Sequence, residues 1–466
     1  MTSKNSKVFL QHMSTKTPSK SLLLGTETIT SLLIKQAVPA SIGILVMSLN
    51  ILVDSIFVGN WINSDALAAI GVVLPISFFV AALGMAIGIG GSSIISRALG
   101  ADNTDKAKRT FGNMLSLTVL ITVLMAVFGL LYVDSLVPAF GGRGPLFEPA
   151  KVYYKIVFYG IPILGLCMMG NNVIRAEGAP KHAMIAMLIP SVGNLVLDYI
   201  FINRLGMGMA GAAWATTISY FLCFSYVLWF FVSGKSELLC SLKHLLPDWG
   251  ILKEISSLGF VTLSRQATSS FVFLIMNNIL FEISGADGVA VFRIIGSMMM
   301  FALFPVMGVT QGFLPIAGYN YGAQLWGRVR EVIYTSLKIS CGLGVLIFLG
   351  LFFFTYEIAA VFTDNPEVIE QASFAMKLVF LSVPIISIQL IGSAYYQAIG
   401  KAIPALLLTL LRMAIILIPL LLILPNFFGE LGVWISFPIA DVISTVITAY
   451  FLWKAMSKLK PVSSTD

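Results

Sequence analysis

The most regular feature of the chain is a series of twelve long apolar runs. Seven contain no charged residue; they span 36–53, 66–96, 110–133, 156–174, 205–234, 378–400 and 413–429. Four contain a single charge and span 183–202, 255–281, 289–317 and 432–452, and the twelfth, 331–356, has its charges in its first turns. Each run is near or above the roughly 20 residues that a helix needs to cross about 30 Å of hydrocarbon.

The pattern within the runs favours helices over strands. Apolar and polar residues do not alternate with period two, as they would in the strands of a membrane β-barrel. Lipid offers no hydrogen-bond partner to open backbone groups, so that helices remain as the spanning element. The sequence therefore predicts an all-α membrane protein with twelve transmembrane helices.

Composition agrees with this class of protein. Of the 466 residues, 58% are hydrophobic and 11% are charged, and the mean hydropathy is +0.92. These values exclude a soluble globular surface and a disordered chain. Four widely separated cysteines without a C-x-x-C pair argue against a zinc site or a disulfide framework; they are Cys167, Cys223, Cys240 and Cys341.

Lysine and arginine are distributed unevenly between the two sides of the predicted bundle. If the runs alternate in direction, nineteen fall on the side of the termini and three on the other, namely Arg143, Lys151 and Arg204. By the positive-inside rule, both termini are expected in the cytoplasm of a multi-pass plasma (inner) membrane protein. The net charge of +7 is thus a topology signal and does not indicate nucleic-acid binding.

The chain repeats itself at a constant offset of 222 residues. Small residues and prolines recur without a gap, as in the pairs Gly90/Gly312, Gly100/Gly322, Pro162/Pro384 and Gly178/Gly400. An even number of spans per copy gives both copies the same topology, and parallel repeats of this kind are typical of transporters. We expect two pseudo-symmetric six-helix lobes.

The predicted boundaries follow from the runs and from the polar segments between them. We expect a cytoplasmic N-terminal tail (1–31), an N-lobe of helices 1–6 (32–233), a cytoplasmic inter-lobe linker (234–252), a C-lobe of helices 7–12 (253–454) and a cytoplasmic C-terminal tail (455–466). The N-terminal segment lacks the apolar core and cleavage site of a signal peptide.

Few carboxylates lie at membrane depth, where each is costly. Asn50 and Asp54 are four residues apart and share one face of the first helix, and Asn194 and Asp198 repeat this spacing on the fifth. Such oxygens could bind Na⁺, or two neighbouring carboxyl groups could take up a proton. The alternative is that both aspartates cap helix ends and face water.

The second half contains one further candidate. Asp441 lies midway along the last run, where the repeat places Ser219 in the first half, and Arg412 is its expected counter-ion. This pair would either fix helix packing or take part in coupling.

Several stretches, in order and at matching spacing, resemble the multidrug and toxic compound extrusion (MATE) family. They include Val-Asp-Ser-Ile-Phe-Val-Gly at 53–59 and Asn-Val-Ile-Arg-Ala-Glu-Gly at 172–178, with 66–71, 96–100, 194–198, 318–323 and the series from Leu411 through Gly432 to Asp441. The resemblance covers about 32–454. It implies two six-helix lobes (the MATE/MOP fold) around a central cavity that opens alternately to each side. It also implies an antiporter that exports organic, mostly cationic, drugs or toxic compounds in exchange for H⁺ or Na⁺.

The resemblance also implies which residues act. The pattern is closer to the DinF-like and archaeal branch than to the NorM-like one, because the helix-7 glutamate of the latter falls at Ser269. In the former branch the first helix bends at a proline, here Pro39, whose second-half counterpart is Val261. The cation-coupling cluster maps onto Asp54, Asn171, Asn194, Asp198 and Thr216, with Asn50 added by its spacing; Na⁺ binding would fall at Asp54, Asn194 and Asp198.

Alternative functions are weighed on the same residues. A lipid-linked saccharide flippase of the same superfamily would carry cationic groups in its cavity, for which Arg265, Arg293 and Arg412 are available. An enzyme is disfavoured because the three histidines fall in the tail or in loops, without metal-ligand spacing. No cofactor besides the coupling ion is expected, and the expected partners are organic cations and the lipid bilayer, with the protein a monomer.

Overall fold

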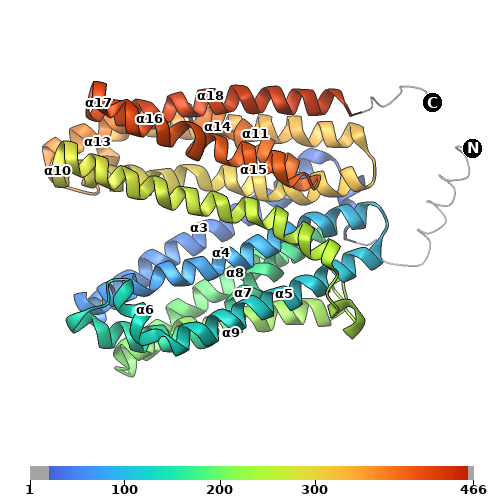
Figure 1. Ribbon diagram of the computed structural model, residues 1–466, viewed down its shortest axis with the longest axis horizontal. Helices are drawn as coiled ribbons and strands as arrows, with labels where there is room; N and C mark the ends of the chain where they lie inside the picture. The colour runs from blue at the N-terminus through green and yellow to red at the C-terminus, as the bar shows by residue number, and fades with distance from the viewer. Residues whose placement is uncertain (1–19, 460–466) are drawn as a thin grey trace, which may run out of the picture.

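The computed structural model describes residues 20–459, which are almost entirely helical (Figure 1). The first half contains α2 (Leu23–Thr26), α3 (Ile29–Trp61), α4 (Ser64–Gly100), α5 (Thr104–Leu131), α6 (Val133–Ala139), η1 (Gly144–Leu146), α7 (Phe147–Ala176), α8 (Pro180–Asp198), η2 (Tyr199–Arg204) and α9 (Gly208–Val232). The second contains η3 (Leu242–Leu245), α10 (Trp249–Gly322), α11 (Trp326–Phe353), α12 (Thr355–Ala360), α13 (Pro366–Val379), η4 (Phe380–Ser382), α14 (Val383–Ala398), α15 (Ala402–Leu410), η5 (Leu411–Leu417), α16 (Ile418–Ile423), α17 (Pro425–Phe428) and α18 (Glu430–Ser457).

The number of membrane spans agrees with the sequence. Eleven helical segments of the described chain are long and apolar enough to cross a bilayer, and one of them, α10, is 74 residues long. That helix is interrupted at Gly285, whose φ of 64° and ψ of −144° suit glycine. The two parts of α10 are separate spans, which gives the predicted total of twelve.

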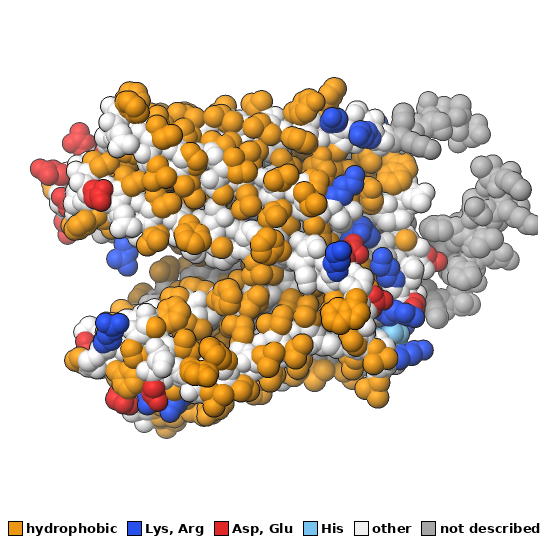
Figure 2. Space-filling view, viewed as in Figure 1, with side chains coloured by type: hydrophobic (Ala, Val, Ile, Leu, Met, Phe, Trp, Pro, Cys, Tyr) orange, Lys and Arg blue, Asp and Glu red, His pale blue; other side chains and the backbone are white. Residues whose placement is uncertain are grey.

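The helices form two lobes that lie side by side. In Figure 1 the helices from α3 to α9 make up one lobe, and those from α10 to α18 make up the other. The lobes meet at the end of the molecule where the described chain begins and ends, and they diverge toward the opposite end (Figure 1). Figure 2 shows the cleft between them at that opposite end.

The backbone confirms the internal repeat. Helices α5 and α11 both contain 28 residues, and α9 and α18 begin at Gly208 and Glu430, all at the offset of 222. Asp102 and Gln324, which also correspond at this offset, both have the positive φ angles that are rare for residues other than glycine, 56° and 58°. One packing plan is therefore used twice.

The outer surface is that of a membrane protein. Side chains such as Leu131 and Phe353, which correspond to each other in the repeat, are 74% and 70% exposed. Figure 2 shows hydrophobic side chains over the length of both lobes, with Lys and Arg gathered toward the end where the described chain begins and ends. An apolar surface of this extent is stable in contact with lipid.

The boundaries differ slightly from those expected. The first membrane helix begins at Ile29, within the predicted tail 1–31, and α2 precedes it with Leu24 fully packed. Helix α10 begins at Trp249, inside the predicted linker 234–252, and α18 continues to Ser457. The remaining parts of both predicted tails, 1–19 and 460–466, lie outside the described residues.

Pro39 lies inside the first membrane helix. Helix α3 runs from Ile29 to Trp61 and includes this proline. Proline removes one hydrogen bond of the helix interior, which weakens the helix locally without forcing it to break. The bend at this residue stays a prediction.

Candidate functional site

A cavity of about 190 Å³ lies among the helices of the N-lobe. Residues of α3, α4, α7, α8 and α9 line it, including five of the six predicted coupling residues, namely Asn50, Asp54, Asn171, Asn194 and Thr216. Side chains separated by up to 166 positions in the sequence are thus brought to one place. Met168 also lines the cavity and provides a pliable apolar surface.

A chain of amide and hydroxyl groups connects three of the helices. The Asn50 side-chain amide of α3 donates to Oδ1 of Asn194 on α8 over 3.0 Å and to the Ser191 carbonyl over 3.2 Å. The Asn194 amide in turn donates to Oγ1 of Thr216 on α9 over 3.5 Å. Asn50 and Asn194, each predicted to share a helix face with an aspartate, therefore also connect α3, α8 and α9.

The two predicted aspartates lie against each other. Asp198 is fully buried, and its carboxyl group lies close to that of Asp54. No hydrogen-bond donor within residues 20–459 reaches either oxygen of Asp198. The alternative that Asp198 caps a helix end in water is wrong. Two neighbouring carboxyl groups, one of them buried, repel each other when both are ionised unless a proton or a cation neutralises them.

The helix that carries Asp198 changes form at this residue. Helix α8 ends there and continues as the π-helical η2. A π turn is wider than an α turn and is often found at functional sites. It marks Asp198 as a special position independently of its charge.

Two tyrosines complete the site and were not identified from the sequence. Tyr153 and Tyr220 line the same cavity as Asp54 and Thr216. In apolar runs that contain many aromatic residues, nothing in the sequence separates these two tyrosines from packing residues.

Asn171 occupies the cavity wall but uses its side chain elsewhere. Its amide donates to the Ala183 carbonyl over 2.6 Å, and its Oδ1 accepts from Nη2 of Arg175 over 3.0 Å. Arg175 is itself buried, with 5% of its surface exposed. The structure thus places Asn171 beside a buried cation rather than in contact with the aspartates.

The C-lobe contains the second predicted pair. Arg412, in the π-helical η5, forms an ion pair with Asp441 of α18, and Ser382 donates to the same carboxylate. Both charged side chains are at least 94% buried. The pair joins two helices of this lobe, and a buried pair of this kind fixes packing once both partners are present.

The C-lobe has no counterpart of the aspartate pair. At the offset of 222, the positions of Asn50 and Asp54 hold Val272 and Met276, and that of Asp198 holds Leu420. Val272 and Met276 are buried in the hydrophobic core of the C-lobe, and Leu420 packs against it. The repeat thus preserves the backbone and replaces the polar site with an apolar core.

The lobes meet through small residues. A Cβ atom on Gly100 would overlap with the Tyr319 carbonyl, and one on Gly322 would overlap with that of Arg97, so that the two matched glycines let α4 and α10 approach closely. Ser93 donates to the Gln397 carbonyl over 2.6 Å, and Arg97 pairs with Glu254 at 2.7 Å. These contacts hold the lobes together at the end where the described chain begins and ends.

Two helical lobes that are repeats of one another, joined at one end and separated at the other, are the architecture of a membrane transporter. The sequence model of the MatE family matches residues 39–200 and 263–423, one segment in each lobe. The chain belongs to this family.

Curated relatives are similar over nearly the whole chain. Multidrug export protein MepA of Staphylococcus aureus (strain MSSA476) is 27% identical over 406 residues, which cover 87% of this chain and 89% of the relative. The MepA protein of Staphylococcus saprophyticus is 26% identical over 431 residues, or 91% and 93% of the two chains.

Solved structures agree with the fold. The outward-facing conformation of a multidrug resistance MATE family transporter of the MOP superfamily has a TM-score of 0.89 and 26% identity, with 96% of this chain and 99% of that chain covered. A MATE protein in the bent conformation gives a TM-score of 0.90 at 26% identity, with 97% and 100% covered. The predicted all-α two-lobed fold is confirmed.

Proposed function

We propose that the chain is a multidrug exporter driven by exchange for a cation, with the Asp54–Asp198 pair as its coupling site. The observation that carries this proposal is that Asp54 lines the N-lobe cavity close to the fully buried Asp198, whose carboxylate oxygens receive no hydrogen bond from the described chain. The export function is supported by the relatives, which are named multidrug export proteins. The flippase alternative gains no support from them.

The surroundings of the pair favour a proton as the coupling ion. Asp198 receives no donor from other described side chains, so that a proton shared with Asp54 would satisfy both carboxyl groups. A sodium ion would instead take the oxygens of Asp54, Asn194 and Asp198 as ligands. Coupling then resides in the N-lobe alone, which is the DinF-like pattern implied by the sequence, because Met276 replaces the aspartate in the C-lobe.

The proposed cycle uses two conformations that bind the ion differently. The cleft at the end opposite the described chain ends is the outward opening if those ends are cytoplasmic, as the distribution of lysine and arginine indicates. An ion that binds both conformations equally would shift nothing. Protonation of the pair removes its repulsion, and the helices α3 and α8 that carry it can then repack and expel the drug.

The test is ethidium efflux in proteoliposomes under an imposed pH gradient and, separately, under a sodium gradient. The Asp54→Asn variant is expected to lose efflux down to the rate of protein-free liposomes under both gradients, while it still inserts and purifies as a single species. Asp65→Asn, at an exposed carboxylate in the first turn of α4, is the matched control and should transport normally. Wild-type rates in Asp54→Asn would contradict the proposal.

A further inference from the structure

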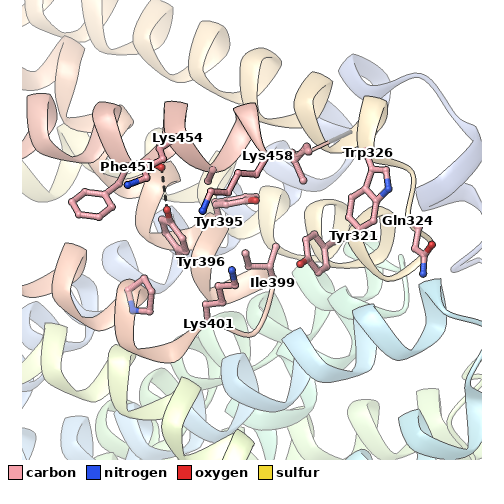
Figure 3. A pocket seen from close by; sticks show the side chains of 13 residues that line it. Tyr321, Gln324, Trp326, Tyr395, Tyr396, Ile399, Lys401, Phe451, Lys454 and Lys458 are labelled. Atoms are coloured by element: carbon pink, nitrogen blue, oxygen red, sulfur yellow. Dashed lines mark hydrogen bonds between the residues drawn. The ribbon is translucent and has the colours of Figure 1, made fainter. Parts of the chain in front are cut away.

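A hollow of about 580 Å³ lies in the C-lobe at the end of the molecule where the described chain begins and ends (Figure 3). We call it the basic pocket. Three lysines from two parts of the chain reach it: Lys401 from the turn between α14 and α15, and Lys454 and Lys458 from the end of α18. Figure 3 shows these lysines around the same space as Tyr395 and Tyr396.

The charge of the pocket is uncompensated. Its lining contains no aspartate or glutamate, and no carboxylate in the described part of the chain forms an ion pair with any of the three lysines. Lys454 and Lys458 are four residues apart on one helix face, where like charges are unfavourable. The positive-inside rule requires lysines on the cytoplasmic side of the membrane, but it does not require three of them to line one pocket.

The walls are fixed in place by hydrogen bonds. Arg330 of α11 donates through Nη2 to the carbonyls of Met456 and Leu459, over 2.9 and 2.5 Å, and so holds the end of α18. The Tyr396 hydroxyl donates to the Phe451 carbonyl over 3.0 Å. The pocket therefore exists before any ligand binds, which lowers the cost of binding.

The same place in the N-lobe is filled by the chain itself. At the offset of 222, Ser236 and Glu237 correspond to Lys458 and Leu459. The Ser236 hydroxyl and the Glu237 amide donate to Oε1 of Glu177 over 2.7 and 2.9 Å, and the following Leu238 is fully buried. The inter-lobe linker thus occupies this place in the N-lobe, whereas no residue of the range 20–459 fills its basic counterpart.

The surface beside the pocket indicates where a ligand extends. Ile403 and Leu407 of α15 are 73% and 55% exposed, and Phe451 of α18, which also lines the pocket, is 44% exposed. A ligand with an anionic head in the pocket could lay apolar chains along these residues. Basic pockets between membrane helices at the cytoplasmic side bind the head groups of anionic lipids.

We propose that the basic pocket binds the phosphate group of an anionic phospholipid, with the acyl chains against α15 and α18. The lysines supply the charge. The aromatic rings of Tyr321 and Trp326, which pack edge to face with their centroids 5.2 Å apart, form an apolar wall beside the head group. This inference does not depend on the transport proposed above, because none of these residues belongs to the aspartate site.

The experiment counts lipids bound to the full-length protein in detergent by native mass spectrometry, with dioleoylphosphatidylglycerol and dioleoylphosphatidylcholine as probes. The wild type is expected to retain one phosphatidylglycerol in preference to phosphatidylcholine. Replacing all three lysines (K401Q, K454Q and K458Q) should weaken that site by roughly a hundredfold, since each lysine near an anionic lipid contributes about a factor of five.

The control variant carries K106Q, K181Q and K253Q, which remove the same charge from exposed lysines at the same end of the molecule. It should bind phosphatidylglycerol as the wild type does; an equal loss in both variants, or a loss in neither, would overturn the proposal. Displacement of the lipid by millimolar glycerol 3-phosphate would assign the pocket to soluble phosphate esters instead. A chain ending at Leu459 keeps every lining residue of the pocket and should bind phosphatidylglycerol at least as well as the wild type; loss of the bound lipid in this shortened chain would overturn the assignment to the pocket.

Discussion

The two lobes are built on the same backbone plan, yet their centres hold different chemistry. In the N-lobe, Asp54 and Asp198 meet beside a cavity, with Asn50, Asn194 and Thr216 in a chain of hydrogen bonds. In the C-lobe, the same positions are filled by a hydrophobic core. The buried ion pair of the C-lobe, Arg412–Asp441, has both partners and lies on the repeat counterparts of α8 and α9, at the positions of Pro190 and Ser219.

This difference separates two uses of buried charge. The carboxyl groups of the N-lobe lack a cationic partner among the described residues, so that their free energy depends on a mobile ion. The charges of the C-lobe neutralise each other and need no ion. A buried charge without a fixed partner can drive a conformational change, whereas a paired one holds helices together.

The largest expected effect comes from giving the N-lobe the residues of the C-lobe. Asp54→Met combined with Asp198→Leu should abolish gradient-driven ethidium efflux, because no ion can then bind differently to the two conformations. The thermal unfolding midpoint in detergent should stay equal or rise, since a buried carboxyl group and a half-buried one beside it have been removed. Met276→Leu, at the C-lobe counterpart of Asp54, is the control and should leave efflux intact. Transport that persists in the double variant would remove the distinction between the lobes.

The next effect concerns the ion pair of the C-lobe. Asp441→Ala leaves Arg412 buried without its partner and should lower the free energy of unfolding by about 3–5 kcal/mol. Adding Arg412→Met should restore most of that loss, as measured by thermal unfolding in detergent. If the pair only fixes packing, the restored variant exports ethidium at the wild-type rate; a stable but inactive variant would show that the C-lobe also takes part in coupling.

The smallest effect is a pH dependence at Glu177, in the turn between α7 and α8. Burial raises the pKa of this carboxyl group from 4.5 to about 8, opposed by the hydrogen bond from Ser236 and reinforced by the nearby Glu237. Because the folded protein binds this proton more tightly than the unfolded one, the contribution to stability is complete below pH 4.5 and is lost as the pH rises toward 8.

Glu177→Gln keeps an oxygen acceptor and cannot ionise, so that it isolates this proton. Its unfolding midpoint should match the wild type at pH 5 and exceed it increasingly up to pH 9, as measured by thermal unfolding in detergent. Glu148→Gln, in the first turn of α7, is the control. A difference that does not change with pH would show that the Glu177 carboxyl group ionises normally.

Much of the fold follows from patterns that the membrane itself imposes. Long charge-free runs predict the spans, and the repeat at 222 predicts the two lobes, because a constant offset without gaps requires the same helix lengths in both. The contact between Gly100 and Tyr319 at the lobe interface agrees with the role expected of small residues. Helix spacing likewise predicts that Asn50 and Asp54 act from one face.

Other features depend on packing that leaves no mark in the sequence. Tyr153 and Tyr220 differ from other aromatic residues of the spans only in the cavity that they face. In the sequence, Arg175 is one of the positive charges that indicate the topology. In the structure its side chain is buried and donates a hydrogen bond to Asn171.

The break at Gly285 limits how the C-lobe can move. A single residue with non-helical backbone angles reverses the chain between the two spans of α10, whereas the corresponding N-lobe spans are separated at Ile62 and Asn63. So short a link prevents either span of α10 from sliding past the other by even one helical pitch of about 5.4 Å. The two spans of α10 therefore keep their register at this end of the C-lobe, and a change between them is a change of angle about Gly285.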